Sequence, residues 1–493
     1  MLALILTCLF LILYYLYTKN YNFWKSRNVP YEKPVFLFGS FYNIVRRKEH
    51  ILERLCNIYN QFPTPYVGMF IFHQPVLLIR SPDLLKKILV KDFNKFPNRK
   101  IAANEKADPL AFHALFIARD AIWRNMRAKI SPVFTSGKMK LMFPLMQECV
   151  DDLYDFCATH PNEEVDVKMM MKKYTVDIIS SCAFGIKTNC FKDEESEILK
   201  VATKMVDFGS VVRGFSIFCF FFLHSFVDFF KLTFGDKYCT DYLFNVFTTT
   251  LHEREKKKIV RNDLIDLLIN LRKIETITDG YKFDDEVKMA GQAIPFFSAG
   301  NDTTSITLAL TCYELALHTE IQDRLRKEVT EIFQERGTFT YENLQEMKYM
   351  DMVINETLRK YPLAPFLMRE AAEDYTFEET GFTLEKGVSL LVPISGLHYD
   401  PKYYPEPEKY DPERFSDDNK RNLTPYTYLP FGEGPRNCIG QRFALLVSKV
   451  ALARIIKDFV FEATEKTPVP LQLDPGSLFV QNKGGLYVNV RKV

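Results

Sequence analysis

The feature that most constrains this chain is a glycine-rich loop that runs directly into an apolar helical segment. The loop carries Cys438 within the stretch PFGEGPRNCIGQRFA, from Pro430 to Ala444. The residues after Gly440 have the periodicity of a helix, so Cys438 lies just ahead of a helix N-terminus. The dipole and the free N–H groups of a helix start favour a thiolate at that place. A cysteine nucleophile and a metal-bound thiolate both fit this local sequence.

The other residues of the loop distinguish Cys438 from an inert cysteine buried in a regular element. Gly432, Gly434 and Gly440 permit unusual backbone torsions and the close approach of another group. Arg436 places a guanidinium two residues before the sulfur. These residues do not show whether Cys438 is a nucleophile or a metal ligand, because the base that a nucleophile needs can come from any part of a fold.

The composition argues against several classes of function. The chain has 493 residues, enough for one large domain or two to three ordinary ones. Its 43 phenylalanines predict a large apolar interior, and its net charge of +2 gives no sign of nucleic-acid binding. The ten cysteines include no C-x-x-C pair, and no HExxH occurs. This spacing argues against a disulfide scaffold or a zinc site and favours a reducing, cytosol-facing environment.

The start of the chain has the pattern of a membrane anchor. Residues 1–18 are almost entirely apolar, and basic residues follow from Lys19 onward. Basic residues after an apolar span place the remainder of the chain on the cytoplasmic side. The sequence lacks the basic start and small-residue cleavage site of a secreted signal peptide. We therefore expect an uncleaved signal-anchor helix at 1–18, a basic, proline-containing linker at 19–34 and one domain at 35–493.

The domain is expected to be mainly α with a minor β part. The runs YVGMFIF from Tyr66 and PVLLIR from Pro75 have strand composition, and Ser81-Pro82 is a typical helix start. The middle of the chain has helical periodicity. Near the C-terminus, SLFVQNKGGLYVNV predicts a hairpin of two strands around Gly484-Gly485.

The run FSIFCFFFLHSFVDFF, from Phe215 to Phe230, has two interpretations. It is too short for a second membrane span. It can be a buried helix and loop, or a surface that dips into a membrane and lines an apolar entrance. An apolar run alone does not separate these two.

A wider pattern gives Cys438 a role. The segment FGEGPRNCIG matches F-x-x-G-x-R-x-C-x-G at Phe431, Gly434, Arg436, Cys438 and Gly440. This pattern resembles the haem-binding loop of the cytochrome P-450 superfamily, in which a cysteine thiolate holds the haem iron. The resemblance implies a helical domain around haem b with small β-sheets, behind an N-terminal membrane anchor. It also implies that Cys438 is the iron ligand and that the loop, Gly432 included, lies against the haem.

Further motifs of that superfamily follow in the expected order. NETLRKYP places Glu356 and Arg359 on one helix face, and YDPERF supplies Arg414. The resemblance makes these three residues the Glu-Arg-Arg cluster, a structural lock behind the haem. Removal of one member of such a buried network is expected to be costly.

The segment FFSAGNDTTS resembles the superfamily's oxygen-activation motif and lies in a helix expected to begin near residue 284. In this interpretation Gly300 loosens the helix, Thr303 hydrogen-bonds into the gap, Asp302 carries a proton and Ala299 lies at the haem. Pro295 departs from the usual pattern and is expected to kink the helix.

The resemblance also implies residues that bind the haem propionates. Trp123 and Arg127 in WRNMR are four residues apart and share one helix face. Arg369 and Arg436 match two further propionate-binding arginines, and Arg99 is an additional candidate. Guanidinium groups suit carboxylates because both are planar and bidentate.

The resemblance covers essentially the whole chain and is greatest to insect microsomal enzymes that oxidise plant toxins and insecticides. It implies a monooxygenase in the endoplasmic reticulum membrane, with its catalytic domain in the cytoplasm. Electrons would come from NADPH through a flavoprotein reductase, with cytochrome b5 as a second candidate donor. Candidates for the docking face are Arg124, Lys129, Arg442 and Lys449. Candidates for the apolar substrate pocket are Phe297, Ala299, Ala364, Phe366 and Phe479.

Three alternatives remain at this level. The first is a hydroxylase of the same family that acts on endogenous lipids or steroids. The second is a haem-thiolate isomerase or dehydratase that needs no reductase; Asp302 and Thr303 argue against it, because such enzymes can dispense with this pair. The third is a non-enzymatic haem sensor, which the membrane anchor and the apolar regions do not particularly favour.

Overall fold

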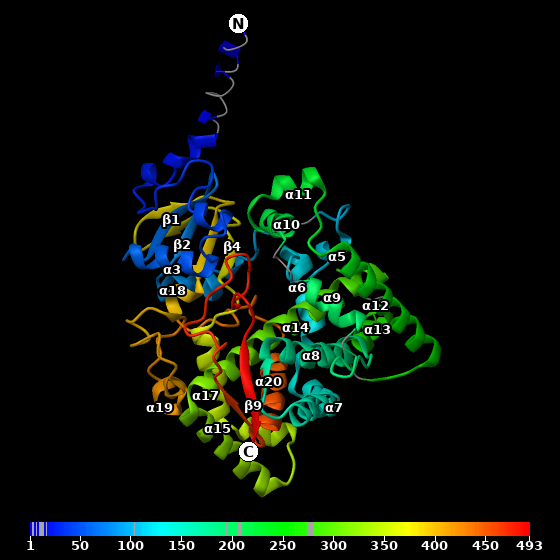
Figure 1. Ribbon diagram of the computed structural model, residues 1–493. Coiled ribbons are helices and arrows are strands. Elements are labelled where there is room, and N and C mark those ends of the chain that lie inside the picture. The colour runs from blue at the N-terminus through cyan, green and yellow to red at the C-terminus, as the bar shows by residue number, and fades with distance from the viewer. Residues whose placement is uncertain are drawn as a thin grey trace.

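The computed structural model describes residues 1, 4–5, 7–8, 14–15, 17–102, 104–193, 195–205, 210–261, 263–274 and 280–493 (Figure 1). The expectation of a mainly helical chain is confirmed. The α-helices are α2 (Tyr42–Val45), α3 (Ile51–Gln61), α4 (Pro82–Lys86), α5 (Pro109–Phe112), α6 (Asp120–Ile130), α7 (Ser136–Thr159), α8 (Val167–Ile179), α9 (Glu197–Met205), α10 (Val211–Phe222), α11 (His224–Phe230), α12 (Lys237–Lys257), α13 (Leu264–Ile274), α14 (Glu286–Leu317), α15 (Thr319–Arg336), α16 (Tyr341–Glu346), α17 (Lys348–Lys360), α18 (Ile394–His398), α19 (Asp417–Lys420) and α20 (Gln441–Ile456).

The strands form small sheets. The strands are β1 (Tyr66–Ile71), β2 (Gln74–Ile79), β3 (Glu163–Asp166), β4 (Phe366–Glu370), β5 (Tyr375–Phe377), β6 (Phe382–Leu384), β7 (Ser389–Pro393), β8 (Phe459–Glu462) and β9 (Tyr487–Lys492). The largest sheet has the order β1-β2-β7-β4, and its first two strands are the pair predicted from the sequence. As expected from Ser81-Pro82, α4 begins at Pro82, because a proline at the first helical position loses no hydrogen bond.

The predicted C-terminal hairpin is wrong in its pairing. The chain does turn at Gly484-Gly485, but the residues before the turn form only an isolated bridge, between Leu473 and Asn482. The strand after the turn, β9, lies between β3 and β8 in a three-stranded sheet. The β9 strand thus has two long-range partners, and sequence proximity did not reveal them.

The helix α14 runs through the middle of the molecule, with α8 and α20 close to it (Figure 1). It begins as predicted, with the Asp285 side chain accepting a hydrogen bond from the backbone N–H of Lys288, and it continues through Pro295. Gly300 allows α8 to approach: a Cβ atom added there would lie 2.9 Å from Ile179 Cδ1. Gly300 therefore lies at the contact between the two helices, and the expectation that it loosens α14 stays a prediction.

The buried apolar residues form two clusters. One lies among the helices and includes Phe297, Leu308 and Leu452; the other lies around the large sheet and includes Leu77, Leu391 and Trp24. Figure 1 shows the large sheet, with α3 and α18 beside it, on one side of the molecule and α9, α12 and α13 on the other. The site described below lies where residues of both sides meet.

The N-terminal anchor expected at residues 1–18 falls half outside the described residues. Among the residues that the structure does describe, no helix is long and apolar enough to cross a membrane. The Phe215–Phe230 run forms parts of α10 and α11, with Phe220 and Phe222 buried but Phe229 and Phe230 79% and 58% exposed. The run is therefore partly core and partly surface. Burial of one part is confirmed, and contact of the exposed part with a membrane stays a prediction.

Candidate active site around Cys438

Cys438 lies at the end of a tight loop, three residues before α20. Its backbone N–H donates to the carbonyl oxygen of Phe431 at 2.8 Å. Burial raises the pKa of the Cys438 thiol, while the backbone N–H of Gly440 and the guanidinium of Arg127 act in the opposite direction. The side chain is nevertheless exposed. The thiol is therefore surrounded by protein and still accessible to a ligand.

The glycines of the loop have different functions. Gly432 and Gly434 have φ values of +69° and +74°, which strain any residue with a Cβ atom. A Cβ atom at Gly434 would also lie 1.9 Å from the carbonyl oxygen of Leu89. Gly440 has an ordinary φ of −87°, and a Cβ atom there would meet no atom closer than 4.0 Å. The predicted unusual torsions are therefore confirmed at two positions, and Gly440 leaves open space beside the helix start.

The middle of α14 faces the same region. Phe296 of α14 contacts Phe443 of α20, with ring centroids 5.8 Å apart. Ala299 is exposed although its neighbours Phe297 and Asn301 are fully buried. Thr303, one turn later, is half-buried and donates its hydroxyl to the carbonyl oxygen of Ala299 at 2.7 Å. Ala299 and Thr303 therefore share an accessible face of α14.

Two predicted residues of α14 point elsewhere. Phe297 is 0% exposed and packs edge-on against Phe184, with centroids 5.6 Å apart. It lies two residues from Ala299, on nearly the opposite face of the helix, so its assignment to the substrate pocket is wrong. Asp302 is also buried and pairs with Lys172 of α8, Nζ to Oδ1 2.8 Å.

The remaining pocket candidates belong to both sides of the molecule: Phe366 lies in the cluster around the large sheet, and Phe479 packs against the cluster among the helices. Phe366 begins β4, is 9% exposed and packs against Phe221 and Phe222 of α10. Ala364 and Phe479 are half-buried. These positions suit a partly apolar wall, and their role as substrate contacts stays a prediction.

Arginines from four segments gather around the loop. Arg436 stacks on Trp123, 4.0 Å from the ring centroid, and its Nε donates to the carbonyl oxygen of Pro97 at 2.7 Å. Arg127 of α6 donates to the backbone carbonyl oxygen and to Oδ1 of Asn437, at 2.9 and 2.8 Å. The predicted WRNMR pair thus lies directly against the cysteine loop.

The same cluster includes Arg99 and Arg369. Arg99 Nη2 donates to the carbonyl oxygen of Arg436 at 3.2 Å, and Arg369 Nη1 of β4 donates to that of Met368 at 2.8 Å. Burial and the neighbouring arginines lower the pKa of Arg99 to about 10, of Arg369 to about 9 and of Arg436 to about 8. The cluster therefore holds positive charge that the protein itself does not neutralise.

Two donor atoms of this cluster are buried without a hydrogen-bond partner in the described structure, Arg369 Nε and Arg436 Nη1. Buried polar atoms in folded proteins are almost always paired, so such orphans mark a place where a ligand completes the hydrogen bonds. An anion with carboxylate groups suits guanidinium donors. With an accessible thiol, an exposed alanine and these arginines, the described residues fit a flat, dicarboxylate-bearing haem.

The predicted Glu-Arg-Arg cluster forms a separate network. Arg359 Nε and Nη2 donate to the two carboxylate oxygens of Glu356, at 2.7 and 2.8 Å, and both side chains are 0% exposed. Arg414 Nε lies 3.5 Å from Glu356 Oε1. Sequence spacing predicted the contact between Glu356 and Arg359 correctly. The structure adds His398, whose Nδ1–H bonds to the carbonyl oxygen of Arg359 at 3.0 Å and whose Nε2 accepts from Leu429 N–H at 2.9 Å.

One predicted docking residue is placed wrongly. Lys449 is 3% exposed and bonds to Asp351 and to the carbonyl oxygen of Leu344, so it does not belong to a surface patch. Arg124 and Arg442 are exposed, and Lys129 is half-buried and bonds to the carbonyl oxygen of Tyr281.

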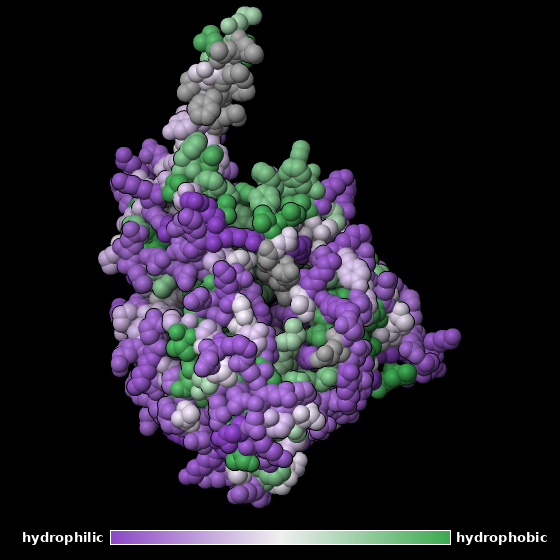
Figure 2. All heavy atoms as spheres, in the orientation of Figure 1, coloured by the Kyte–Doolittle hydropathy of each residue, from purple (hydrophilic) through white to green (hydrophobic). Residues whose placement is uncertain are grey.

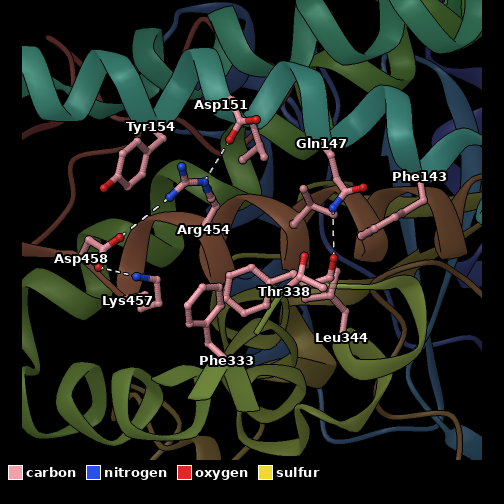
Figure 3. A pocket seen from close by; sticks show the side chains of 13 residues that line it. Phe143, Gln147, Asp151, Tyr154, Phe333, Thr338, Leu344, Arg454, Lys457 and Asp458 are labelled. Carbon is pink, nitrogen blue, oxygen red and sulfur yellow. Dashed lines mark hydrogen bonds and ion pairs between the residues drawn. The ribbon is translucent and has the colours of Figure 1, made fainter. Parts of the chain in front are cut away.

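A cavity of about 400 Å³ lies away from this site, between α7, the connection of α15 to α16, and the end of α20 (Figure 3). Tyr154, Phe333 and Arg454 line it, and Arg454 is held by Asp151 at 3.1 Å. With a rise of about 1.5 Å per helical residue, Arg454 lies about 20 Å along α20 from the cysteine loop. This cavity therefore has no part in the chemistry at Cys438.

The chain is similar to known proteins over nearly its full length. A family model described as Cytochrome P450 matches residues 29–490. The chain is 39% identical to cytochrome P450 6k1 and 38% to cytochrome P450 6j1, both of Blattella germanica, over 98% of this chain and 95% of each relative. It is 35% identical to probable cytochrome P450 6g2 of Drosophila melanogaster, over 96% and 95%.

The chain therefore belongs to the cytochrome P450 family. It is a monooxygenase that uses haem with a cysteine thiolate as the iron ligand and takes electrons from a reductase. The fold, with helices around the site and small sheets beside it, agrees with this family.

Proposed function

We propose that this member of the cytochrome P450 family inserts one oxygen atom from O2 into lipophilic foreign compounds such as plant toxins and insecticides. The proposal rests on one observation. Cys438 is accessible, and the arginine cluster at its loop includes Arg369 and Arg436, each with a buried donor atom that has no hydrogen-bond partner in the described structure. Its relatives from cockroach and fly, at 35–39% identity, support an insect enzyme of this type. A hydroxylase acting on endogenous lipids uses the same site, and the substrate distinguishes the two.

The residues of this chain have distinct functions in the proposed reaction. Haem, when bound, supplies the oxygen-activating redox chemistry. Cys438 would ligate its iron, and Arg436, Arg369 and Arg127 would hold its carboxylates. Asp302 and Thr303 would move protons during the reaction. Thr303 donates its hydroxyl to the carbonyl oxygen of Ala299.

Electrons come, in this proposal, from NADPH through a membrane-bound flavoprotein reductase that docks on the cysteine side. Arg124 and Arg442 are exposed basic residues near that side and contribute to the docking face. Exposed positive charge speeds the association of an acidic partner and loses this effect at high salt. The salt dependence of electron transfer to Arg124→Glu measures this contribution, and an unchanged dependence would remove Arg124 from the interface.

The enzyme is proposed to lie on the endoplasmic reticulum membrane with an anchor at residues 1–18. Apolar side chains gather beside the N-terminal segment and over α10 and α11 (Figure 2). They include Phe36 at 43%, Phe215 at 49% and Phe229 at 79% exposure. Exposed apolar patches of this kind suit contact with lipid. Phe229→Asp should weaken sedimentation with phosphatidylcholine vesicles; unchanged sedimentation would place α11 away from lipid.

The assignment is tested by the spectrum of the reduced, CO-bound protein. The Soret band of the wild-type protein should be shifted far to the red, as thiolate ligation requires, and Cys438→Ala should lose this shifted band. Retention of the thiolate spectrum by Cys438→Ala would overturn the assignment. Spectral shifts on adding plant toxins, insecticides, steroids and fatty acids then rank the classes of substrate.

A further inference from the structure

The cavity at the far end of α20 has the size and the floor of a ligand pocket. Its volume of about 400 Å³ lies in the range of small-molecule sites, about 300–1,000 Å³. Four of its lining side chains are at most 6% exposed and form an apolar floor: Phe143, Val150, Leu344 and Val450. Figure 3 shows Arg454 between the side chains of α7 and Phe333. A molecule in this cavity would bury apolar surface on the floor.

Aromatic rings line the cavity above this floor. Phe333 and Phe339 lie with their ring centroids 5.2 Å apart, and Tyr154 comes from α7. The guanidinium carbon of Arg454 lies 3.4 Å from the ring centroid of Tyr154, and Lys457 Nζ lies 4.7 Å from that of Phe333. Aromatic rings pack well against other flat rings, in offset or edge-to-face contact. The lining therefore suits a flat aromatic molecule.

The charged groups of the cavity neutralise one another. Arg454 Nε donates to Asp151 Oδ1 at 3.1 Å, and Arg454 Nη1 lies 3.9 Å from Asp458 Oδ2. Lys457 Nζ donates to Asp458 Oδ1 at 2.6 Å. Two carboxylates thus alternate with two cations, unlike the uncompensated arginines at the cysteine loop. An ionic ligand would meet like charge from one of these pairs, so the cavity favours an uncharged one.

Two lining side chains keep unused hydrogen-bonding atoms. The only hydrogen bond that Arg454 donates to the described residues comes from Nε, so its terminal nitrogens remain available. Gln147 donates from Nε2 to the carbonyl oxygen of Phe339 at 3.0 Å, and its Oε1 accepts nothing from the described part of the chain. Asp151, which holds Arg454, lies one turn, about 5.4 Å, after Gln147 on α7. The cavity therefore offers a donor and an acceptor about one helical turn apart.

We propose that this cavity is a second ligand site, separate from the one at Cys438, for flat, uncharged aromatic compounds that carry a carbonyl oxygen and an N–H or O–H group. The carbonyl oxygen accepts a hydrogen bond from Arg454, and the N–H or O–H group donates to Gln147 Oε1. The rings lie on the apolar floor, between Tyr154 and Phe333. The inference does not rest on the proposed function, because binding here needs no oxygen chemistry.

The first experiment is equilibrium dialysis of acridone against the full-length, haem-loaded protein. Acridone is flat and uncharged, with a carbonyl oxygen and an N–H group on opposite edges. Clotrimazole is added first, so that its imidazole ligates the haem iron and fills the site at Cys438. One acridone should bind per chain while the haem spectrum stays that of the clotrimazole complex. No bound acridone up to its solubility limit would refute the second site.

The second experiment repeats the dialysis with Arg454→Met and Arg324→Met. Arg324 is a matched control, because its guanidinium carbon lies 4.0 Å from the ring centroid of Tyr349 and it pairs with Glu413, away from the cavity. The affinity for acridone should fall by a factor of about ten to one hundred in Arg454→Met, as expected when a charged donor is removed. It should not change in Arg324→Met. Equal affinities in the two variants would overturn the proposal.

Charged analogues test the class of ligand. Acridone-4-carboxylate and 10-methylacridinium keep the flat ring system and add a negative or a positive charge. Each should bind at least about tenfold more weakly than acridone, because each brings a charge next to a like charge of the cavity. Equal or tighter binding of either ion would contradict a site for uncharged compounds.

A filling variant gives an answer even if Arg454→Met does not fold. Thr338 is exposed at the edge of the cavity, so Thr338→Trp can place a ring in the space without disturbing the core. This variant should lose the acridone site, and unchanged binding would refute the proposed location. Loss of both results with an intact thiolate CO spectrum would refute this inference alone, whereas a wild-type protein without that spectrum would refute only the proposed function.

Discussion

Two groups of buried arginines in this molecule have opposite electrostatic surroundings. Arg359 donates to both oxygens of Glu356 and to the carbonyl oxygens of His398, Pro407 and Lys409. The arginines at the cysteine loop lower one another's pKa and leave donor atoms without partners.

A paired buried charge is typical of a structural network, whereas several uncompensated buried charges gathered at one place indicate a ligand site. The difference between Arg359 and Arg369 therefore distinguishes the structural lock from the binding site without reference to any relative. Three substitutions test this distinction, in order of their expected effect on the free energy of unfolding.

Glu356→Gln should have the largest effect. It leaves the buried charge of Arg359 without its carboxylate partner, and breaking a buried pair in this way costs about 3–5 kcal/mol. Denaturant unfolding of the haem-loaded protein measures this loss. As a surface control, Glu378→Gln removes a carboxylate that is 87% exposed and lies 3.3 Å from Lys87, and it should change stability by less than about 0.5 kcal/mol. Equal losses in both variants would refute the view that the lock is structural.

The titration of His398 should have an intermediate effect on the free energy of unfolding. Burial, with a contribution from the charge of Arg359, lowers the pKa of His398 to about 3. Below pH 6.5 the unfolded chain binds a proton that the folded protein does not, so stability falls as the pH falls from about 6.5 towards 3.

Between pH 7 and pH 5 this histidine should account for about 2 kcal/mol of lost stability. His398→Asn keeps hydrogen-bonding atoms without titrating, so its unfolding free energy should depend less on pH by that amount. Identical slopes in the two proteins would contradict the neutral state assigned to His398.

Arg369→Met should have the smallest effect on stability and a clear effect on haem. Removing an uncompensated buried charge should leave the free energy of unfolding of the haem-free protein within about 0.5 kcal/mol of wild type, or raise it. The affinity for haem should fall about tenfold to a hundredfold, because a hydrogen bond to a charged group contributes about 1.5–3 kcal/mol. A large loss of stability with unchanged haem affinity would make Arg369 a second structural arginine.

The sequence predicted most of what depends on local geometry. It predicted the strands from Tyr66 and Pro75, and the helix through Thr303. The contact between Glu356 and Arg359 followed from their spacing of three residues, because a helix fixes that distance. The cysteine loop was recognised from five positions within ten residues, whose order does not depend on the remainder of the fold.

The sequence failed where a side chain depends on elements far along the chain. Phe297 was assigned to the pocket, although its face of α14 packs against Phe184. Lys449 was assigned to the surface, although it bonds to Asp351. Lys172 and His398 were missed; a lysine within the apolar run MMMKKYTVDII of α8 was the only available sign of the first.

The sequence by itself therefore determined the cysteine loop, the order of the motifs and the helix that carries the predicted oxygen-activation residues, because short spacings fix these. Only the tertiary structure decided the partners of β9, the face of Phe297 and the pairing of Asp302 with Lys172. Each of these depends on how two elements pack across many intervening residues. Packing fixes the position of one helix face against another, and no spacing along the chain contains that information.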